Sequence, residues 1–146
     1  MKKILFALVA FFSLGVFSAQ AGDDRIISKD KLPAEAQAFL NAHFAGLKIS
    51  YAKEERDFLE RSYEVVLVDG TKLEFSRGGV WKDVDCRYSE VPAAIVPAPI
   101  KNYIDEHFAG EKILKIERDS NDYEVKLSNR HELIFDKKFN IVDIDN

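Results

Sequence analysis

The tetrapeptide His-Phe-Ala-Gly occurs twice in this chain of 146 residues, at positions 43–46 and 107–110. Each copy ends a segment that begins with Pro-Ala, at Pro33 and at Pro97. A segment that returns with the same start and the same end indicates an internal duplication. We therefore expect two modules of one kind, residues 32–86 and 96–146, joined by a connector over residues 87–95.

The segment before each tetrapeptide has the apolar spacing of an amphipathic α-helix. Its apolar, aromatic and histidine side chains recur at intervals of three and four residues, which places them on one helical face. In the first module these residues are Ala36, Phe39, Leu40, His43 and Phe44. In the second module they lie 64 positions later, at Ile100, Tyr103, Ile104, His107 and Phe108. The sequence thus predicts one helix in each module.

After each helix the pattern changes to the alternation that is typical of β-strands. Four strands are expected in each module, near residues 49–53, 63–67, 73–75 and 81–85, and near 113–117, 123–127, 133–135 and 141–145. This pattern predicts an α+β fold of two tandem αββββ repeats, with the helices packed on one face of the antiparallel sheet or sheets. Because about 50 residues make a marginal core, we expect the two sheets to join edge to edge or to pack closely.

The first 31 residues read as a leader and a connecting segment. Lys2 and Lys3 precede an apolar run over residues 4–16, and Ala19-Gln20-Ala21 has the small residues that a signal peptidase recognises. The apolar run is shorter than the roughly 20 residues that span a bilayer, so we expect a signal peptide over residues 1–21, cleaved after Ala21, rather than a membrane anchor. Residues 22–31 are polar and are expected to form a flexible lead-in.

Cysteine usage and charge restrict the class of protein further. Cys86 is the only cysteine, so the cleavage site has no lipid-attachment cysteine and the chain forms no internal disulfide. We therefore expect a periplasmic or secreted protein that is not a lipoprotein. Without Lys2 and Lys3, 19 Lys and Arg residues face 25 Asp and Glu residues, a formal charge of −6. Such a charge disfavours nucleic acid and anionic lipid as partners.

The combination of these motifs resembles the PepSY-like, β-lactamase-inhibitor-protein-like family of small secreted bacterial proteins. The resemblance covers residues 32–146 and includes the Pro-Ala helix, Tyr-Glu-Val-x-Leu at 63–67 and 123–127, Leu-x-Phe at 73–75, Leu-x-Phe-Asp at 133–136 and the Val-Asp-x-Asp ending. It implies tandem αββββ repeats whose helices cover one face of a sheet and leave the other face open. It also implies binding rather than chemistry, although most members have no known function and the inhibitor's target does not follow from the fold.

Several residue types invite a catalytic or metal-binding reading, but none forms a complete site. His43 and His107 recur because the helix recurs, and neither helix has a second ligand at metal spacing. Cys86 follows Asp83 and Asp85, which raise a thiol pKa and oppose a nucleophilic role. These aspartates and their counterparts Asp143 and Asp145 lack a calcium-loop pattern and are interpreted as solvated strand ends. No catalytic residue, metal site or cofactor is predicted.

The candidate contact surface is the sheet face opposite the helices, which strand alternation assigns to one set of side chains. The predicted partner-binding residues are Val66, Val68, Lys72, Glu74, Trp81, Lys126 and Ile134. Trp81 also fits a second position, packed at the seam between the modules, because its spacing to Val84 breaks the alternation and indicates a β-bulge. The first hairpin of the first module is four residues longer than its counterpart, and its Phe58 and Leu59 form a possible second contact.

Together these features favour a non-enzymatic, periplasmic or secreted binding or inhibitor-like module. Its open sheet face would contact a protein or peptide partner, whose identity the sequence does not give. The alternative is a carrier of a small molecule or of a calcium-type metal ion in the cell envelope.

Overall fold

The computed structural model describes residues 24–146, so the predicted signal peptide lies outside the described residues. Two α-helices are present in this part of the chain, α1 (Ala34–His43) and α2 (Ala98–His107), and neither is long and apolar enough to cross a membrane. Short 3-10 helices cover Lys29–Lys31 and Ala93–Ile95. The strands are β1 (Arg25–Ile27), β2 (Ile49–Arg56), β3 (Arg61–Leu67), β4 (Lys72–Ser76), β5 (Trp81–Asp85), β6 (Ile113–Arg118), β7 (Asp122–Leu127), β8 (Glu132–Asp136) and β9 (Ile141–Asp145).

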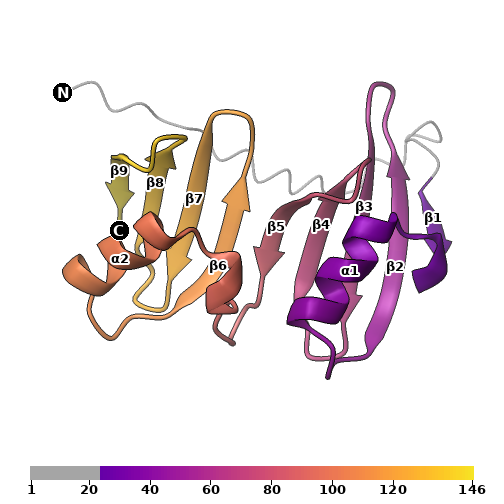
Figure 1. The fold of residues 1–146 in the computed structure, drawn as a ribbon, viewed down its shortest axis with the longest axis horizontal. Coiled ribbons are helices and arrows are strands. Elements are labelled where there is room, and N and C mark those ends of the chain that lie inside the picture. Colours follow the sequence, from indigo (N-terminus) through magenta and orange to yellow (C-terminus); the bar gives the residue numbers. More distant parts are fainter. Residues whose placement is uncertain (1–23) are drawn as a thin grey trace.

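The fold is α+β, with one antiparallel sheet of nine strands in the order of the sequence. The two helices lie over the same face of this sheet (Figure 1). In both halves the element order is one helix followed by four strands, α1 with β2–β5 and α2 with β6–β9. The halves meet where β5 pairs with β6, through Asp83 opposite Glu117, Val84 opposite Ile116 and Asp85 opposite Lys115. The two sheets expected from the sequence are therefore joined edge to edge.

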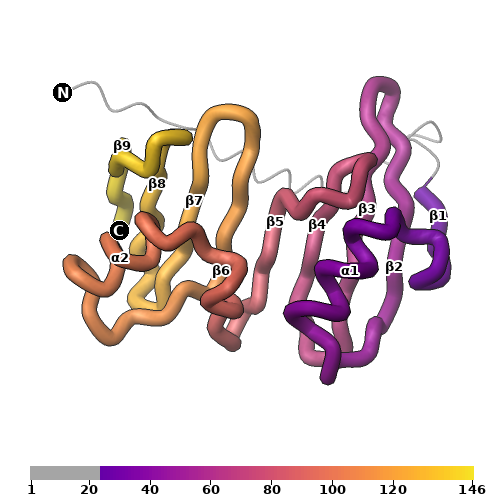
Figure 2. Tube along the Cα trace, in the orientation of Figure 1, coloured from indigo at the N-terminus to yellow at the C-terminus, as the bar shows by residue number. Residues whose placement is uncertain are grey.

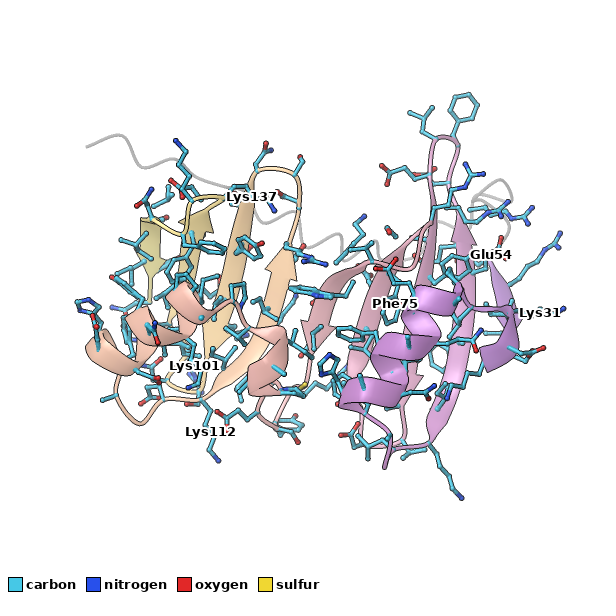
Figure 3. All side chains as sticks on the ribbon, viewed as in Figure 1. Lys31, Glu54, Phe75, Lys101, Lys112 and Lys137 are labelled. Atoms are coloured by element: carbon cyan, nitrogen blue, oxygen red, sulfur yellow. The ribbon has the colours of Figure 1, made fainter. Side chains whose placement is uncertain are left out.

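The hydrophobic core lies between the helices and the sheet, because alternate strand residues point to the same side. Phe75, which is labelled in Figure 3, is fully buried and meets Phe39 of α1 edge to face at 5.6 Å. Phe135 is likewise fully buried and meets Tyr103 of α2 at 5.4 Å. The predicted helix stripe faces this core through its buried residues Ala36 and Leu40 in α1, Phe44 directly after α1, and Ile100 and Ile104 in α2.

The segment expected to be a flexible lead-in is ordered in its described part, and that expectation was wrong. Ile26 of β1 lies opposite Lys53 of β2, and Ile27 lies opposite Ala52. The side chain of Ile27 packs against the core. Only three residues form β1, and their stability comes from pairing with a distant strand, a contact that local sequence pattern does not reveal.

The β2–β3 hairpin extends beyond the neighbouring strands (Figure 2). Phe58 and Leu59 at its tip are 96% and 86% exposed. The backbone N–H of Asp57 donates to the carbonyl oxygen of Glu60 at 2.8 Å, which closes the turn. The four extra residues of the first module therefore place two apolar side chains in solvent.

Trp81 is the main departure from the predicted faces. The expected bulge is present, because the β4–β5 register shifts between Glu74 and Phe75, and Trp81 lies opposite the core residue Phe75. Trp81 is 9% exposed on the helix side of the sheet, so its prediction as an open-face residue was wrong. Arg118 of β6 covers its ring, with the guanidinium carbon 3.8 Å from the ring centroid. Trp81 is thus packed at the seam between the halves, the second position that the sequence allowed.

Candidate functional site: the open face of the sheet

Acidic side chains form a continuous row across the face of the sheet that the helices leave uncovered. Each member lies directly opposite the next on the neighbouring strand, and together they are Glu64, Glu74, Asp83, Glu117 and Glu124. We call these five residues the carboxylate row. Their sequence neighbours Val65, Val84, Ile116 and Val125 are fully buried on the helix side, so strand alternation places the row on the open face. The row crosses from the first half to the second through Asp83 and Glu117.

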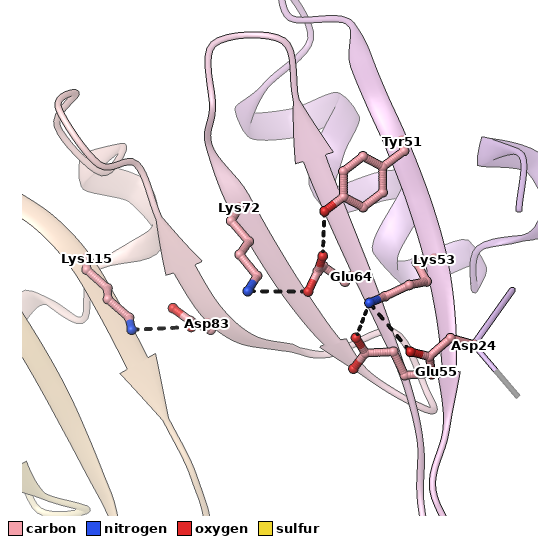
Figure 4. A network of polar contacts seen from close by, with 8 residues as sticks. All are labelled: Asp24, Tyr51, Lys53, Glu55, Glu64, Lys72, Asp83 and Lys115. Carbon is pink, nitrogen blue, oxygen red and sulfur yellow. Dashed lines mark hydrogen bonds and ion pairs between the residues drawn. The ribbon is translucent and has the colours of Figure 1, made fainter. Parts of the chain in front are cut away.

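The first carboxylate of the row is fully compensated. Glu64 is only 6% exposed, and it accepts a hydrogen bond from the Tyr51 hydroxyl at 2.9 Å. Lys72 Nζ lies 3.3 Å from the other Glu64 oxygen. Donation to Glu64 raises the pKa of Tyr51, because ionisation of the phenol would lose that hydrogen bond. Figure 4 shows this triad beside Lys53, whose ammonium group pairs with Glu55 at 2.8 Å and with Asp24 at 3.7 Å.

The middle of the row is short of cations. Lys115 Nζ lies 3.6 Å from Asp83 and 3.7 Å from Glu117, so one ammonium group serves two carboxylates. The Oδ1 atom of Asp83 is buried and has no hydrogen-bond partner. Burial raises the pKa of Asp83 to about 7, although Lys115 opposes the shift. The site therefore favours either a proton or another positive group near Asp83.

Glu74 and Glu124, which flank Asp83 and Glu117 in the row, also have raised pKa values. Burial raises the pKa of Glu74, and the neighbouring carboxylates Glu55, Glu64 and Glu117 add to the effect of burial. Burial also raises the pKa of Glu124, with Glu117 and Glu132 acting in the same direction. Neither Glu74 nor Glu124 has an ion-pair partner in the described chain. A positively charged group placed over this part of the sheet would be attracted by several carboxylates at once.

A groove of about 390 Å³ lies beside the row at the junction of the halves. Its lining carries both charges and one aromatic side chain, from Asp85, Arg87, Tyr88, Leu114, Lys115, Glu117, Glu124, Lys126 and Glu132. Tyr88 is 94% exposed. The neighbouring Arg87 has a left-handed backbone (φ 55°), and its N–H donates to Asp85 Oδ1 at 2.9 Å. The groove thus combines charged groups with an aromatic ring that is free to contact a ligand.

Six of the seven predicted contact residues are on or beside the open face. Val66 lies opposite Lys72, and Glu74 belongs to the carboxylate row. Lys126 lies opposite Lys115 and lines the groove, and Ile134 lies opposite Glu124. Val68 follows the end of β3 and is 60% exposed. Trp81, as described above, faces the helices. Whether these residues bind a partner stays a prediction.

Sequence reasoning missed the importance of Tyr51, Asp83, Lys115 and Glu117. Asp83 was expected to be a solvated strand end, but its side chain is only 14% exposed, so that interpretation was wrong. It is buried because β6 lies against β5 at this point. The acidic residues of the row can be seen in the sequence of each strand, but that they lie side by side follows only from the register of the paired strands.

The residues considered for catalysis and metal binding take structural positions. His43 and His107 lie against Phe39 and Tyr103, with ring centroids 4.7 and 4.3 Å apart. Burial raises the pKa of Cys86 to about 11, with Asp69 and Asp85 contributing and a hydrogen bond with Thr71 opposing. Within residues 24–146, no three side chains of His, Cys, Asp or Glu are gathered so that they could hold a metal ion.

A sheet covered by helices on one side, with charged side chains on the other, defines a class of small α+β protein with an open sheet face. The family described as "putative beta-lactamase-inhibitor-like, PepSY-like" matches residues 61–143. The chain belongs to this PepSY-like family. The comparison with curated proteins finds no match.

Three solved structures have closely similar folds. A "putative calcium-regulated periplasmic protein" from Bacteroides thetaiotaomicron is 52% identical, with a TM-score of 0.83 over 85% of this chain and 98% of that chain. A "putative periplasmic protein" from Bacteroides vulgatus is 49% identical, with the same TM-score and the same coverage. Another B. vulgatus "putative periplasmic protein of unknown function" is 34% identical, with a TM-score of 0.81 over 85% of this chain and 100% of that chain.

The raised pKa of Asp83 predicts a specific dependence of stability on pH. The ordinary pKa of the carboxyl is 3.8 and the folded value is about 7, so between them the folded chain binds more protons than the unfolded chain. Stability therefore falls as pH rises through this window. Asp83→Asn removes the ionisation and should stabilise the protein by about 1–3 kcal/mol at about pH 8, with little change at about pH 4. Urea unfolding at both pH values measures the difference.

The matched control is Asp143→Asn, at the corresponding position of the exposed strand β9. This variant should follow the pH dependence of the parent protein. Part of the decline should persist in Asp83→Asn because Glu74 and Glu124 also have raised pKa values. Equal pH dependence in Asp83→Asn and the parent would contradict the assignment of a raised pKa to Asp83.

Proposed function

We propose that this protein is a non-enzymatic binding module of the periplasm whose open sheet face receives a protein or peptide partner. A periplasmic location is supported by the similar Bacteroides proteins, which are described as periplasmic, and by the leader sequence. An inhibitor-like role agrees with the description of the family. The observation that carries the proposal is the carboxylate row, which runs across both halves on the face that the helices leave uncovered.

The charges of the row indicate which partner groups it would bind. Five adjacent strands place its first and last members about 19 Å apart, a width comparable to that of a small protein contact. Lys and Arg side chains of a partner would supply the positive charge that Glu74 and Glu124 lack and that Asp83 shares with Glu117 through Lys115. Such contacts would give orientation and fast association more than raw affinity. Affinity would come from apolar contacts, for which Val66, Ile134 and Tyr88 are placed.

The tip of the β2–β3 hairpin gives a second contact in this proposal. Phe58 and Leu59 are more exposed than the other large apolar side chains of the described chain except Tyr88. Large exposed apolar groups on a projecting loop are common in contact surfaces, because burying them against a partner is favourable. The tip would act together with the open face if a partner reached over the end of the hairpin.

Site-specific photo-crosslinking in the cells that make the protein tests this proposal directly. A photo-reactive amino acid at Val66 or Lys126 should give a crosslinked species of defined mass, because both positions lie on the open face. The matched controls are Glu35 and Asp105, exposed positions on the outer sides of α1 and α2. They should give no such species. Equal crosslinking from the helices and the open face, or none from the open face, would contradict the proposal.

Calcium binding is the second candidate, and it is favoured by one relative. The B. thetaiotaomicron protein that is 52% identical is described as calcium-regulated. The carboxylate row supplies the oxygen ligands that calcium prefers. However, the described side chains do not converge on a common metal position. Ligation would need the carboxylates to move toward one another, which makes this candidate the weaker of the two.

A thermal titration separates the two candidates. If the row serves a partner's side chains, calcium at about 1 mM should raise the melting temperature no more than magnesium does, because both ions then act only by screening. A rise with calcium that continues with the logarithm of its concentration, and that magnesium does not reproduce, would favour the second candidate, because a specific ligand stabilises in proportion to the logarithm of its concentration once that exceeds the Kd. Glu74→Gln, which neutralises a member of the row that has no ion-pair partner in the described chain, should abolish such a rise and would so identify its source.

A further inference from the structure

The last strand, β9, has a backbone edge that no other strand of residues 24–146 covers. It pairs with β8 on one side only. Its counterpart in the first half is β5, which has the same register with its neighbour: Leu73 lies opposite Val84, and Leu133 lies opposite Ile144. On its other side β5 pairs with β6. The pairing of β5 with β6 therefore serves as a guide to the kind of strand that would fit beside β9.

The side chains of β9 are exposed where those of β5 are covered. Val84 of β5 is fully buried, because Ile116 of β6 lies opposite it. Ile144, at the same position of β9, is 45% exposed, and the adjacent Val142 is 63% exposed. Both would lose solvent contact if another strand paired with β9. This strand thus carries two exposed apolar side chains, Ile144 on its helix side and Val142 at the bulge, that no neighbouring strand of the described chain covers.

On the open face, β9 carries two acidic side chains, and both accept hydrogen bonds from its backbone. Asp143 and Asp145 lie on the open face, opposite Ile134 and Glu132. The N–H of Ile144 donates to Asp143 Oδ1 at 2.9 Å, and the N–H of Asn146 donates to Asp145 Oδ1 at 2.8 Å. These carboxylates already accept hydrogen bonds from the backbone N–H groups that an incoming strand would need, and they add negative charge to the edge. Both effects disfavour pairing with a strand that brings no positive charge.

We propose that the edge of β9 is a docking site for an extended peptide whose residues alternate between apolar and basic. In the β5–β6 register, an apolar residue lies opposite Ile144, as Ile116 lies opposite Val84. A basic residue lies opposite Asp145, as Lys115 lies opposite Asp85. A second basic residue opposite Asp143 draws that carboxylate away from the backbone, and the freed N–H then donates to the incoming strand. The bound peptide forms a tenth strand by β-augmentation.

A second copy of this chain fits the edge poorly. The strand that corresponds to β6 is β2, and its outer edge is already occupied by β1. Symmetric antiparallel pairing of two β9 strands about their centres places Asp143 opposite Asp143 of the other copy, and like charges directly opposite each other are destabilising. Pairing through β2 or through a second β9 is thus disfavoured, and the two aspartates of β9 select a separate basic and apolar segment as the occupant. This inference goes beyond the open-face proposal, because it concerns an edge and not a face.

The test uses a synthetic peptide with the sequence of residues 112–119 in which Glu117→Lys supplies the second basic residue. Added to isotope-labelled protein, it should shift the amide resonances of residues 142–146 and slow their exchange with solvent. A control peptide with glutamate at positions 115 and 117 should bind at least about tenfold more weakly, because two opposite-charge pairs become like-charge pairs. This peptide control does not depend on the folding of any protein variant.

Protein variants locate the site independently. Asp143→Lys/Asp145→Lys should weaken binding of the basic peptide by about tenfold. Asp105→Lys/Glu106→Lys on α2 makes the same change of net charge at exposed positions and should leave the affinity unchanged. Shifts that fall on the carboxylate row instead of β9 would overturn the proposal, as would equal affinity for the two peptides or equal weakening in the two variants.

Discussion

The pairing of β5 with β6 is the interaction on which the rest of the structure depends. It turns two helix-and-four-strand units into one sheet and aligns the acidic residues of both into one row. On the helix side the contact is favourable: Val84 and Ile116 bury each other, Arg118 stacks on Trp81, and its Nε donates to the Trp81 carbonyl oxygen at 2.8 Å. On the open side it brings Asp83 against Glu117, which is unfavourable unless a cation lies nearby.

The two sides of the seam therefore have different roles. Apolar burial and the stacked arginine hold the halves together, and they are sufficient to place like charges opposite each other. Lys115 partly offsets the repulsion by pairing with Asp83 and Glu117. An uncompensated buried atom remains at Asp83 Oδ1. Groups that are costly for stability but held in place by their surroundings are a common mark of contact sites.

Local patterns in the sequence predicted much of the fold. The helix stripes at Ala36 and Leu40 and at Ile100 and Ile104 do face the core, because helical spacing alone decides which side is apolar. Strand alternation placed Val66, Lys72 and Glu74 correctly for the same reason. It failed at Trp81, where the bulge reverses the side to which the residue points. The sequence was compatible with both positions of Trp81, the open face and the seam, and did not distinguish between them.

Features that depend on pairing between distant segments could not be predicted in this way. Residues 25–27 become a strand only because the edge of β2 accepts them. The carboxylate row exists only when the register of every strand from β3 to β7 is known, since a slip of one residue sends a side chain to the other face. The raised pKa of Asp83 also requires β6 as a neighbour. The candidate site is thus a property of the assembled sheet.

Native-state amide hydrogen exchange tests most directly whether the two halves form one sheet and share one open face. The account predicts that the slowest amides of β5 and β6, near Val84 and Ile116, exchange with the same free energy as those of the core strands β4 and β8, because all open only on global unfolding. Clearly faster exchange at β5 and β6 than in both sets of core strands would contradict it. That result would mean that the halves separate while each stays folded, and the carboxylate row would then not be a continuous surface.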